Sequence, residues 1–121
     1  MLDLSDERKS ISSETTFLND TDDRSTLRAA LRELAADVSQ SLHQNEVSAL
    51  TIQIKVRYSD FTTLTRQIRL EEPVSEERDI YRMACFLLAK NNLVQGPLRL
   101  LGIGASTLVA PQAEQQMRLA F

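Results

Sequence analysis

Hydrophobic and polar residues alternate along several stretches of the chain, a pattern that is typical of strands with one buried face. The clearest alternation covers residues 49–58, where the residues of one parity are apolar: Ile52, Ile54, Val56 and Tyr58. Alternation also predicts strands over 9–17 and 62–70. An apolar run predicts a last strand over 98–109, in which Gly102 and Gly104 would permit a bulge or a close backbone approach.

Two other stretches have apolar residues three and four positions apart, which predicts amphipathic helices. The stripe of the first helix is Leu27, Ala30, Leu31, Leu34, Val38 and Leu42. Short oxygen-bearing side chains in 19–23 are suited to cap its first turn. The stripe of the second helix is Ile80, Met83, Ala84, Leu87 and Leu88. We expect Pro73 to end the preceding strand and Ser75 to be the N-cap of this helix.

The predicted order is β-α-β-β-α-β, in a chain of 121 residues that is long enough for one domain with its own core. This order favours an α+β fold, a two-layer sandwich in which both helices cover one face of a four-stranded antiparallel sheet. Ser59 and Asp60 are typical turn residues, so the strands on either side of them should pair as a hairpin. We expect a linker remnant in 1–8, the domain in 9–109 and a flexible tail in 110–121.

Basic residues are concentrated on this hairpin, although the whole chain has a formal net charge of −3. Residues 51–70 contain Lys55, Arg57, Arg66 and Arg69 against Asp60 alone, a net charge of +3. Hydroxyl side chains lie between the basic ones, and the combination offers both charge and directional donors to phosphate. Because Arg66 breaks the alternation, it should lie either at a sheet edge or on a bulge that turns it outward.

The sheet face opposite the helices is therefore a candidate surface for nucleic acid. Tyr58 and Phe61 are assigned to the core or the turn, which leaves no aromatic residue on this face for base stacking. A duplex backbone then fits better than splayed single strands. The alternative is a polar face that contacts only solvent, as half-exposed antiparallel sheets commonly have. The pattern alone leaves both interpretations open.

The other chemistry-bearing residues indicate structural roles. Cys85 lies in an apolar helical stretch and should be a buried core residue. A single cysteine excludes an internal disulfide and favours a reducing, cytoplasmic compartment. His43 should be a solvated residue at a helix end, and one histidine without nearby cysteines predicts no metal site. No apolar run approaches the length of a membrane span.

Three segments together resemble the little finger domain of Y-family, DNA polymerase IV-like translesion polymerases. Residues 8–17 (RKSISSETTF) resemble its opening strand, 55–66 (KVRYSDFTTLTR) its central hairpin and 98–106 (LRLLGIGAS) its last strand. The segments occur in the family's order. The resemblance implies a reversed ferredoxin-like fold and a DNA-binding domain of a polymerase that acts on damaged DNA.

In that family the domain holds primer-template duplex mainly through sugar-phosphate, and the resemblance carries this role to the matching positions. It implies that Ser10, Ile11 and Ser12 offer backbone amides to phosphate. The side chains implied to reach phosphate are those of Lys55, Arg57, Thr63, Thr65, Arg66 and Arg99. Many family members have glycine at the position of Ser12, and the Cβ of a serine restricts how closely a phosphate can approach the backbone.

The last six residues resemble the hexapeptide by which bacterial proteins bind the sliding clamp. Gln116 would donate and accept hydrogen bonds at a pocket rim, while Met117, Leu119 and Phe121 would fill an apolar groove. The implied partners are double-stranded primer-template DNA, the beta sliding clamp and the polymerase's own catalytic domains, with no membrane. We expect no catalytic residue, metal or cofactor in this chain, and Mg²⁺ in the missing catalytic domain.

Two other classes of protein compete with this interpretation. A ferredoxin-like protein-interaction or regulatory module would use the free sheet face for a partner, and it would need an exposed apolar patch there. A small stand-alone enzyme would need a cluster of perturbed titratable groups in a pocket. One histidine and one cysteine make such a cluster hard to assemble.

Overall fold

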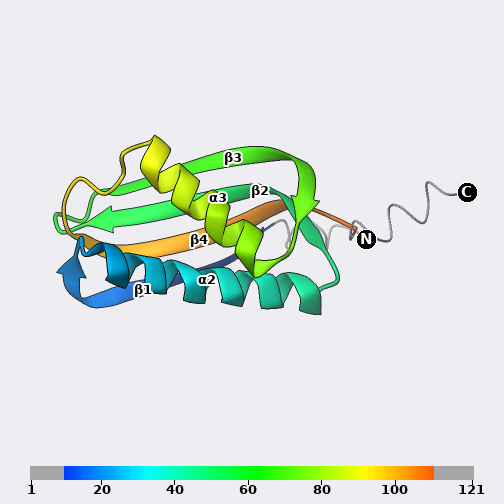
Figure 1. Cartoon of the computed structure of the whole chain (residues 1–121), viewed down its shortest axis with the longest axis horizontal. Helices are drawn as coiled ribbons and strands as arrows, with labels where there is room; N and C mark the ends of the chain where they lie inside the picture. The colour runs from blue at the N-terminus through cyan, green and yellow to red at the C-terminus, as the bar shows by residue number, and fades with distance from the viewer. Residues whose placement is uncertain (1–9, 111–121) are drawn as a thin grey trace, which may run out of the picture.

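The computed structural model describes residues 10–110 and contains six elements. They are β1 (Ser10–Thr21), α2 (Arg24–Gln44), β2 (Ser48–Tyr58), β3 (Thr63–Val74), α3 (Glu77–Lys90) and β4 (Leu98–Val109). The strands form one antiparallel sheet in the order β1-β4-β2-β3. Both helices cover one face of this sheet (Figure 1). The predicted α+β fold and element order are therefore confirmed.

The core lies between the sheet and the helix layer, and it consists of the inward apolar side chains of the strands and the apolar stripes of the two helices. The inward side chains of β2 are Ile52, Ile54 and Val56, and all three are fully buried. The buried apolar residues of the helices are Leu27, Leu31, Leu34, Ala35, Val38 and Leu42 in α2, and Ile80, Ala84, Leu87 and Leu88 in α3. Burial of one large apolar side chain stabilises the fold by roughly 1.5–3 kcal/mol, so this packing fixes the orientation of every strand.

Two expectations for the connection between β3 and α3 are wrong. β3 continues through Pro73 to Val74, because β3 is an edge strand and a proline there removes no hydrogen bond that the sheet needs. The N-cap of α3 is Glu76 rather than Ser75, and its side chain makes no capping bond. The carbonyl of Ser75 instead accepts a hydrogen bond from the Ser39 hydroxyl at 2.7 Å, which ties this connection to α2.

The irregularity in β4 lies at its start rather than at its glycines. The pairing with β2 shifts register between Arg57 and Tyr58, which face Leu100 and Leu98. Gly102 and Gly104 pair regularly with both neighbouring strands. Because one extra residue occupies the shift, Leu100 points to the opposite face from Leu98. The arginine between these two leucines is held at the turn end of the sheet.

The lone cysteine and histidine lie close to where the sequence predicts them. Cys85 packs against the core but is only partly buried, so the prediction of a buried core residue is confirmed only in part. His43 lies in the last turn of α2 and is exposed, as predicted. Its Nε2 is 3.5 Å from Oε2 of Glu76, which places it beside the first turn of α3.

Candidate nucleic-acid interface

The strand register defines a polar surface on the side of the sheet that faces away from the helices, which we call the open face. Residues paired across neighbouring strands point to the same side, so the rows of the sheet can be followed from strand to strand. The open face comprises Ser10, Ser12, Glu14 and Thr16 of β1, Leu100, Gly102, Gly104 and Ser106 of β4, Thr51, Gln53, Lys55 and Arg57 of β2, and Thr63, Thr65, Gln67 and Arg69 of β3.

Lys55 lies near the middle of the open face and reaches across β4 to β1. Its Nζ is 3.2 Å from Oε1 of Glu14, and both side chains are partly exposed. The β4 residue between them is Gly102, which has no side chain to obstruct this contact. Lys55 is therefore on the predicted face, but an acidic neighbour already compensates its charge.

Arg57 lies one row nearer the turn and is positioned by Thr63 of β3. Its Nε donates to Oγ1 of Thr63 at 2.9 Å, so these two predicted site residues act as one unit. On the other side of Arg57 lies Leu100, which is only 4% exposed although it belongs to the open face. The side chains around Leu100 cover it, and the face is consequently polar there.

A strip with little side-chain bulk runs along β4 through Gly102 and Gly104. A Cβ added at Gly102 would lie 3.1 Å from the Glu14 Cβ, while one at Gly104 would lie 3.8 Å from the Cβ atoms of Gln53 and Ser12. Gly104 is the residue paired with Ser12. The Cβ of Ser12 restricts how closely a phosphate can approach the backbone, but the absence of a side chain at Gly104 leaves space for the phosphate directly beside it. A phosphate chain can approach the sheet closely along this strip.

Arg66 does not share the face of Lys55 and Arg57. Its partner in β2 is Ile54, whose side chain is buried in the core, so the register turns Arg66 toward the helix side of the sheet. The pairing of β2 with β3 is regular from Thr63 to Arg69, which excludes the bulge and leaves the predicted edge position. The Arg66 Nη1 donates to the Thr65 carbonyl at 2.7 Å along this edge.

Arg69 is a basic residue of the open face that the set of site residues predicted from sequence omitted. It pairs with Thr51 in the row that contains Ser10 and Ser106. The alternation of Thr63, Thr65, Gln67 and Arg69 already placed it on this parity. The alternation of the sequence therefore predicts the side of Arg69, whereas Arg66 was included only through the resemblance.

Arg99 lies at the turn end of the sheet against Phe61. Its guanidinium carbon is 4.4 Å from the centroid of the Phe61 ring, and its buried Nε has no hydrogen-bond partner within residues 10–110. Phe61 belongs to the β2–β3 turn, as one of the two predicted alternatives has it, with φ of 71° and 64% exposure. The same turn is closed by the Asp60 carboxylate, whose pKa is lowered chiefly by the hydrogen bond from the backbone N–H of Thr62.

The remaining predicted contacts lie in β1. Ser10 and Ser12 are exposed on the open face, whereas Ile11 pairs with Ala105 and turns its side chain toward the core. Only the backbone of Ile11 can therefore serve an anion on this face, which is the role predicted for it. Thr65 is exposed on the open face and pairs with Lys55.

Other predictions fall outside the part of the chain that the structure describes. These are the linker remnant 1–8 and the clamp-binding residues Gln116, Met117, Leu119 and Phe121. Within residues 10–110 no group of His, Cys, Asp and Glu side chains is arranged to hold a metal ion. Neither α2 nor α3 combines the length and the hydrophobicity that crossing a bilayer requires.

The fold is that of the little finger domain of Y-family DNA polymerases. Similar solved structures include the complex of the beta-clamp processivity factor and the little finger domain of PolIV, with a TM-score of 0.67 and 20% identity over 85% of this chain and 91% of that chain. DinB from Sulfolobus solfataricus gives a TM-score of 0.70 at 12% identity, over 84% of this chain and 29% of that one. At these identities the likeness shows the fold alone.

Sequence comparison shows the family. The model of the impB/mucB/samB family C-terminal domain matches residues 8–119, and the chain belongs to this family. The DNA polymerase IV of Dehalococcoides mccartyi (strain CBDB1) is 37% identical over 119 residues, which are 96% of this chain and 30% of the relative. That of Desulfotalea psychrophila is 43% identical over 101 residues, 84% of this chain and 27% of the relative.

The chain therefore spans less than a third of the length of these relatives. It corresponds to a C-terminal domain of a Y-family DNA polymerase and not to the complete polymerase. The prediction of a little finger domain, made from the three sequence segments, is confirmed.

Proposed function

We propose that the open face holds double-stranded primer-template DNA by its sugar-phosphate backbone, as part of a translesion DNA polymerase. The observation that carries this proposal is the placement of Lys55, Arg57 and Arg69 on one side of the sheet in a chain with a net charge of −3. Glu14 is the one acid among the paired residues of that face, while Glu71 and Glu72 follow Arg69 on β3 beyond the regular pairing with β2. Arg99 lies at the turn end of the face. The basic residues are thus gathered where the helices leave the sheet uncovered.

The arrangement suits contact with phosphate rather than with bases. Guanidinium and ammonium groups beside hydroxyls bind phosphate oxygens, which fixes the register of a duplex but carries no sequence information. A polymerase domain that grips only the backbone can slide along DNA and can tolerate altered bases. Arg66 belongs to this proposal only if the duplex extends around the edge strand β3, because its side chain lies on the other side of the sheet.

The test is the affinity of the chain for a labelled duplex as a function of salt concentration. With about four phosphates bound, through Lys55, Arg57, Arg69 and Arg99, the slope of log K against log[salt] should be roughly −3.5. Arg57→Gln should weaken binding to all duplexes alike, whereas Arg78→Gln, in the helix layer, is the matched control and should leave it unchanged. A slope near zero, or a loss confined to certain base sequences, would contradict the proposal.

We also propose that residues 116–121 tether the domain to a bacterial sliding clamp. The support is the sequence QMRLAF, with a leading glutamine and three apolar anchors. A similar fold occurs in a complex of the beta-clamp processivity factor with the little finger domain of PolIV. Burial of Met117, Leu119 and Phe121 in the clamp favours binding, and the loss of conformational entropy when the segment becomes ordered opposes it. A dissociation constant in the micromolar range is therefore expected. Removal of 116–121 should abolish this binding and leave duplex affinity unchanged.

The competing protein-interaction module is less well supported by the open face. Such a module needs an exposed apolar patch. Leu100, the one large apolar residue in the paired rows of the open face, is 4% exposed, and the exposed Leu18 and Phe61 lie outside these rows. A DNA-holding role also implies a location in the cytoplasm, where bacterial DNA lies. The catalytic activity and its Mg²⁺ are proposed to belong to the part of the polymerase that this chain does not include.

A further inference from the structure

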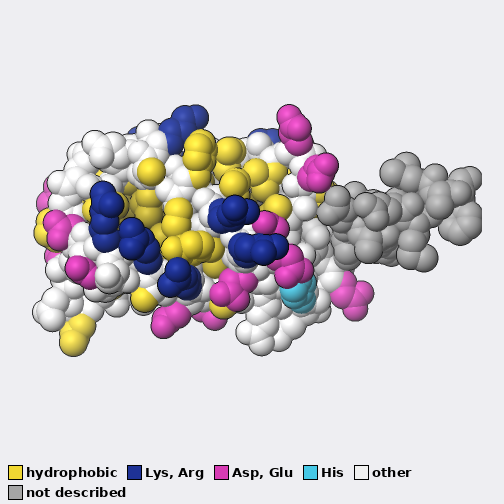
Figure 2. Space-filling view, viewed as in Figure 1, with side chains coloured by type: hydrophobic (Ala, Val, Ile, Leu, Met, Phe, Trp, Pro, Cys, Tyr) yellow, Lys and Arg dark blue, Asp and Glu magenta, His cyan; other side chains and the backbone are white. Residues whose placement is uncertain are grey.

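The helix layer carries a second set of basic residues, on the opposite side of the molecule from the open face. Arg24, Arg28 and Arg32 are four residues apart on α2, so they lie on one side of the helix with about 6 Å of rise between neighbours. All three are exposed, and none forms an ion pair with another residue of the described range 10–110. Basic side chains gather over this part of the helix layer (Figure 2).

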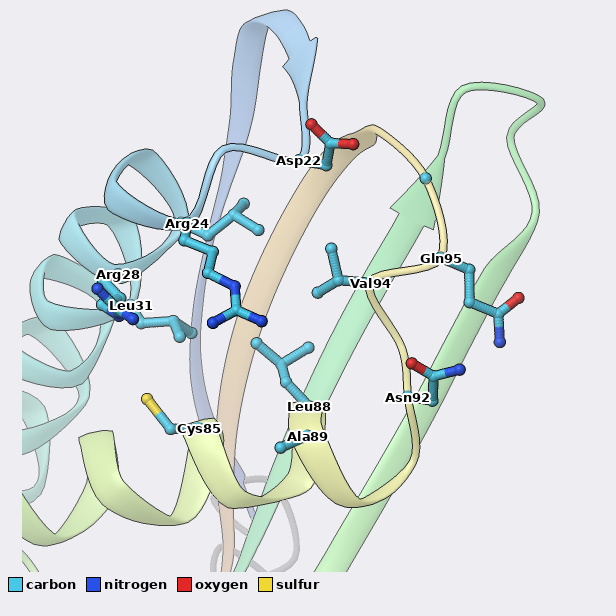
Figure 3. A pocket seen from close by; sticks show the side chains of 12 residues that line it. Asp22, Arg24, Arg28, Leu31, Cys85, Leu88, Ala89, Asn92, Val94 and Gln95 are labelled. Atoms are coloured by element: carbon cyan, nitrogen blue, oxygen red, sulfur yellow. The ribbon is translucent and has the colours of Figure 1, made fainter.

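Two of these arginines border a cavity of about 600 Å³ between the two helices. The start of α2, the end of α3 and residues 92–96 enclose it, and its wall contains Leu27, Leu31 and Leu88. Figure 3 shows the Arg24 guanidinium reaching over this cavity toward Leu88, with the Asp22 carboxylate at the far end. Its size falls within the range of roughly 300–1,000 Å³ that is usual for ligand pockets.

The lining combines an apolar wall with guanidinium groups at its border. Asp22 is the one acid among the lining residues, against Arg24 and Arg28, and Arg32 extends the basic row by one helical turn. A guanidinium fork binds a carboxylate with two parallel hydrogen bonds, while the wall accepts an apolar side chain. An occupant that matches both features has an apolar residue flanked by Asp or Glu.

We propose that this groove between α2 and α3 binds an acidic peptide segment of a partner protein, with one apolar anchor residue in the cavity and carboxylates on Arg24 and Arg28. Single-stranded nucleic acid fits less well, because base stacking needs an exposed aromatic face. No aromatic residue lines the cavity, and the ring of Tyr81, one turn before Cys85 on α3, already has the Arg32 guanidinium carbon 5.1 Å from its centroid.

The two terminal segments outside the described range match the cavity less well than a segment of another protein does. Residues 1–9 include acidic and apolar side chains, but they are attached to Ser10, at the end of β1 remote from Asp22. Nine residues reach at most about 30 Å, whereas the 12 residues of β1 span about 40 Å, so residues 1–9 do not reach the Asp22 end of the cavity. Residues 111–121 contain one acid, Glu114, and one basic residue, Arg118, so they lack the required charge.

The experiment is a selection of random 12-residue peptides displayed on phage against the 121-residue chain, followed by anisotropy measurements with the selected peptides. The expected sequences are enriched in Asp and Glu beside Leu, Ile or Phe. The double variant Arg24→Glu/Arg28→Glu should bind them at least tenfold more weakly. The matched control is Arg78→Glu/Arg82→Glu, the same change at the same spacing on α3 but outside the cavity lining, and its affinity should be unchanged. Duplex DNA affinity of the double variant should equal that of the wild type, which separates this proposal from the function of the open face.

Three outcomes would overturn the proposal. The first is a selection that yields no acidic peptide. The second is acidic peptides that bind the folded double variant as well as the wild type, with folding checked by circular dichroism. The third is that no acidic peptide binds, while the wild type binds labelled oligo(dT) and the double variant binds it more weakly. The space between the helices would then be a nucleic-acid site.

Discussion

Lys55 of β2 and Glu14 of β1 form an ion pair across Gly102, the residue of β4 that lies between them. The pair places a negative charge beside a residue that is proposed to contact phosphate. Replacement of the acid by its neutral amide, Glu14→Gln, should therefore strengthen duplex binding. Exposed ion pairs contribute up to about 1 kcal/mol, so the gain should be roughly two- to fivefold at low salt.

Anisotropy of a labelled duplex measures this gain. Glu33→Gln, which changes the same charge on α2, is the control and should have no effect on duplex affinity. An unchanged affinity in Glu14→Gln would mean that the Lys55 ammonium does not approach phosphate.

The two glycines of β4 should differ in their tolerance of a methyl group. In Gly102→Ala the new Cβ would lie 3.1 Å from the Glu14 Cβ and 3.4 Å from the Ser13 carbonyl oxygen, and the backbone of β1 cannot move away without loss of pairing. Overpacking of this kind costs about 1–3 kcal/mol of the free energy of unfolding. In Gly104→Ala the nearest atoms are 3.8 Å away, so the stability should stay within about 1 kcal/mol of the wild type. Urea denaturation measures the free energy of unfolding of both variants. A larger decrease in Gly104→Ala than in Gly102→Ala would contradict the distances found around the two glycines.

Arg66 and Arg69 are three residues apart on one edge strand but lie on opposite sides of the sheet. Arg69→Ala should weaken duplex binding and make the slope of log K against log[salt] less steep by about 0.9, the value for one phosphate. Arg66→Ala should leave both quantities close to those of the wild type. Equal losses in the two variants would show that the duplex wraps around the edge of β3.

Two exposed carboxylates should make the stability of the domain depend on pH in the acid range. The backbone N–H of Thr26 lowers the pKa of Asp23, and that of Thr62 lowers the pKa of Asp60, each from an ordinary value of 3.8. Because the folded-state pKa is the lower one, the unfolded chain binds more protons in this range. The stabilisation is therefore complete above about pH 5 and is lost as the pH falls through the lowered pKa values.

The double variant Asp23→Ala/Asp60→Ala tests this dependence. Its midpoint of thermal unfolding should lie several degrees below that of the wild type at pH 6, and the two midpoints should converge toward pH 2. Asp22→Ala, which removes a neighbouring carboxylate with no hydrogen bond within residues 10–110, is the control. A constant difference between the proteins at all pH values would contradict the role of the ionised forms.

Hydrophobic periodicity predicted the elements of the fold because each element buries one side. Ile52, Ile54 and Val56 illustrate this, since their shared parity fixes which side of β2 faces the helices. Hydrophobic periodicity could not predict that β3 continues through Pro73. Whether a strand tolerates a proline depends on whether it lies at the sheet edge, and strand order is a property of long-range pairing.

The candidate site was predictable where alternation is regular and uncertain where it is interrupted. Lys55 and Arg57 lie on the predicted side, and Arg69 followed the same parity. Arg66 stands at a position whose side chain points toward the helix side of the sheet, where a charged residue is tolerated only on an edge strand. Its orientation could therefore be predicted only once the order of the strands was known. The side on which Leu98 lies likewise depended on a register shift in β4 between Leu98 and Leu100, and the alternation of the sequence does not indicate this shift.

Ser10 pairs with Ser106 in adjacent strands, so the polypeptide enters and leaves the sheet at one end, opposite the turn between Tyr58 and Thr63. A circular permutant that joins residue 110 to residue 10 through a short linker, with new termini in that turn, would keep every strand pair of the sheet. We therefore expect the permuted chain to form the same sheet, although its strands are synthesised in a different order.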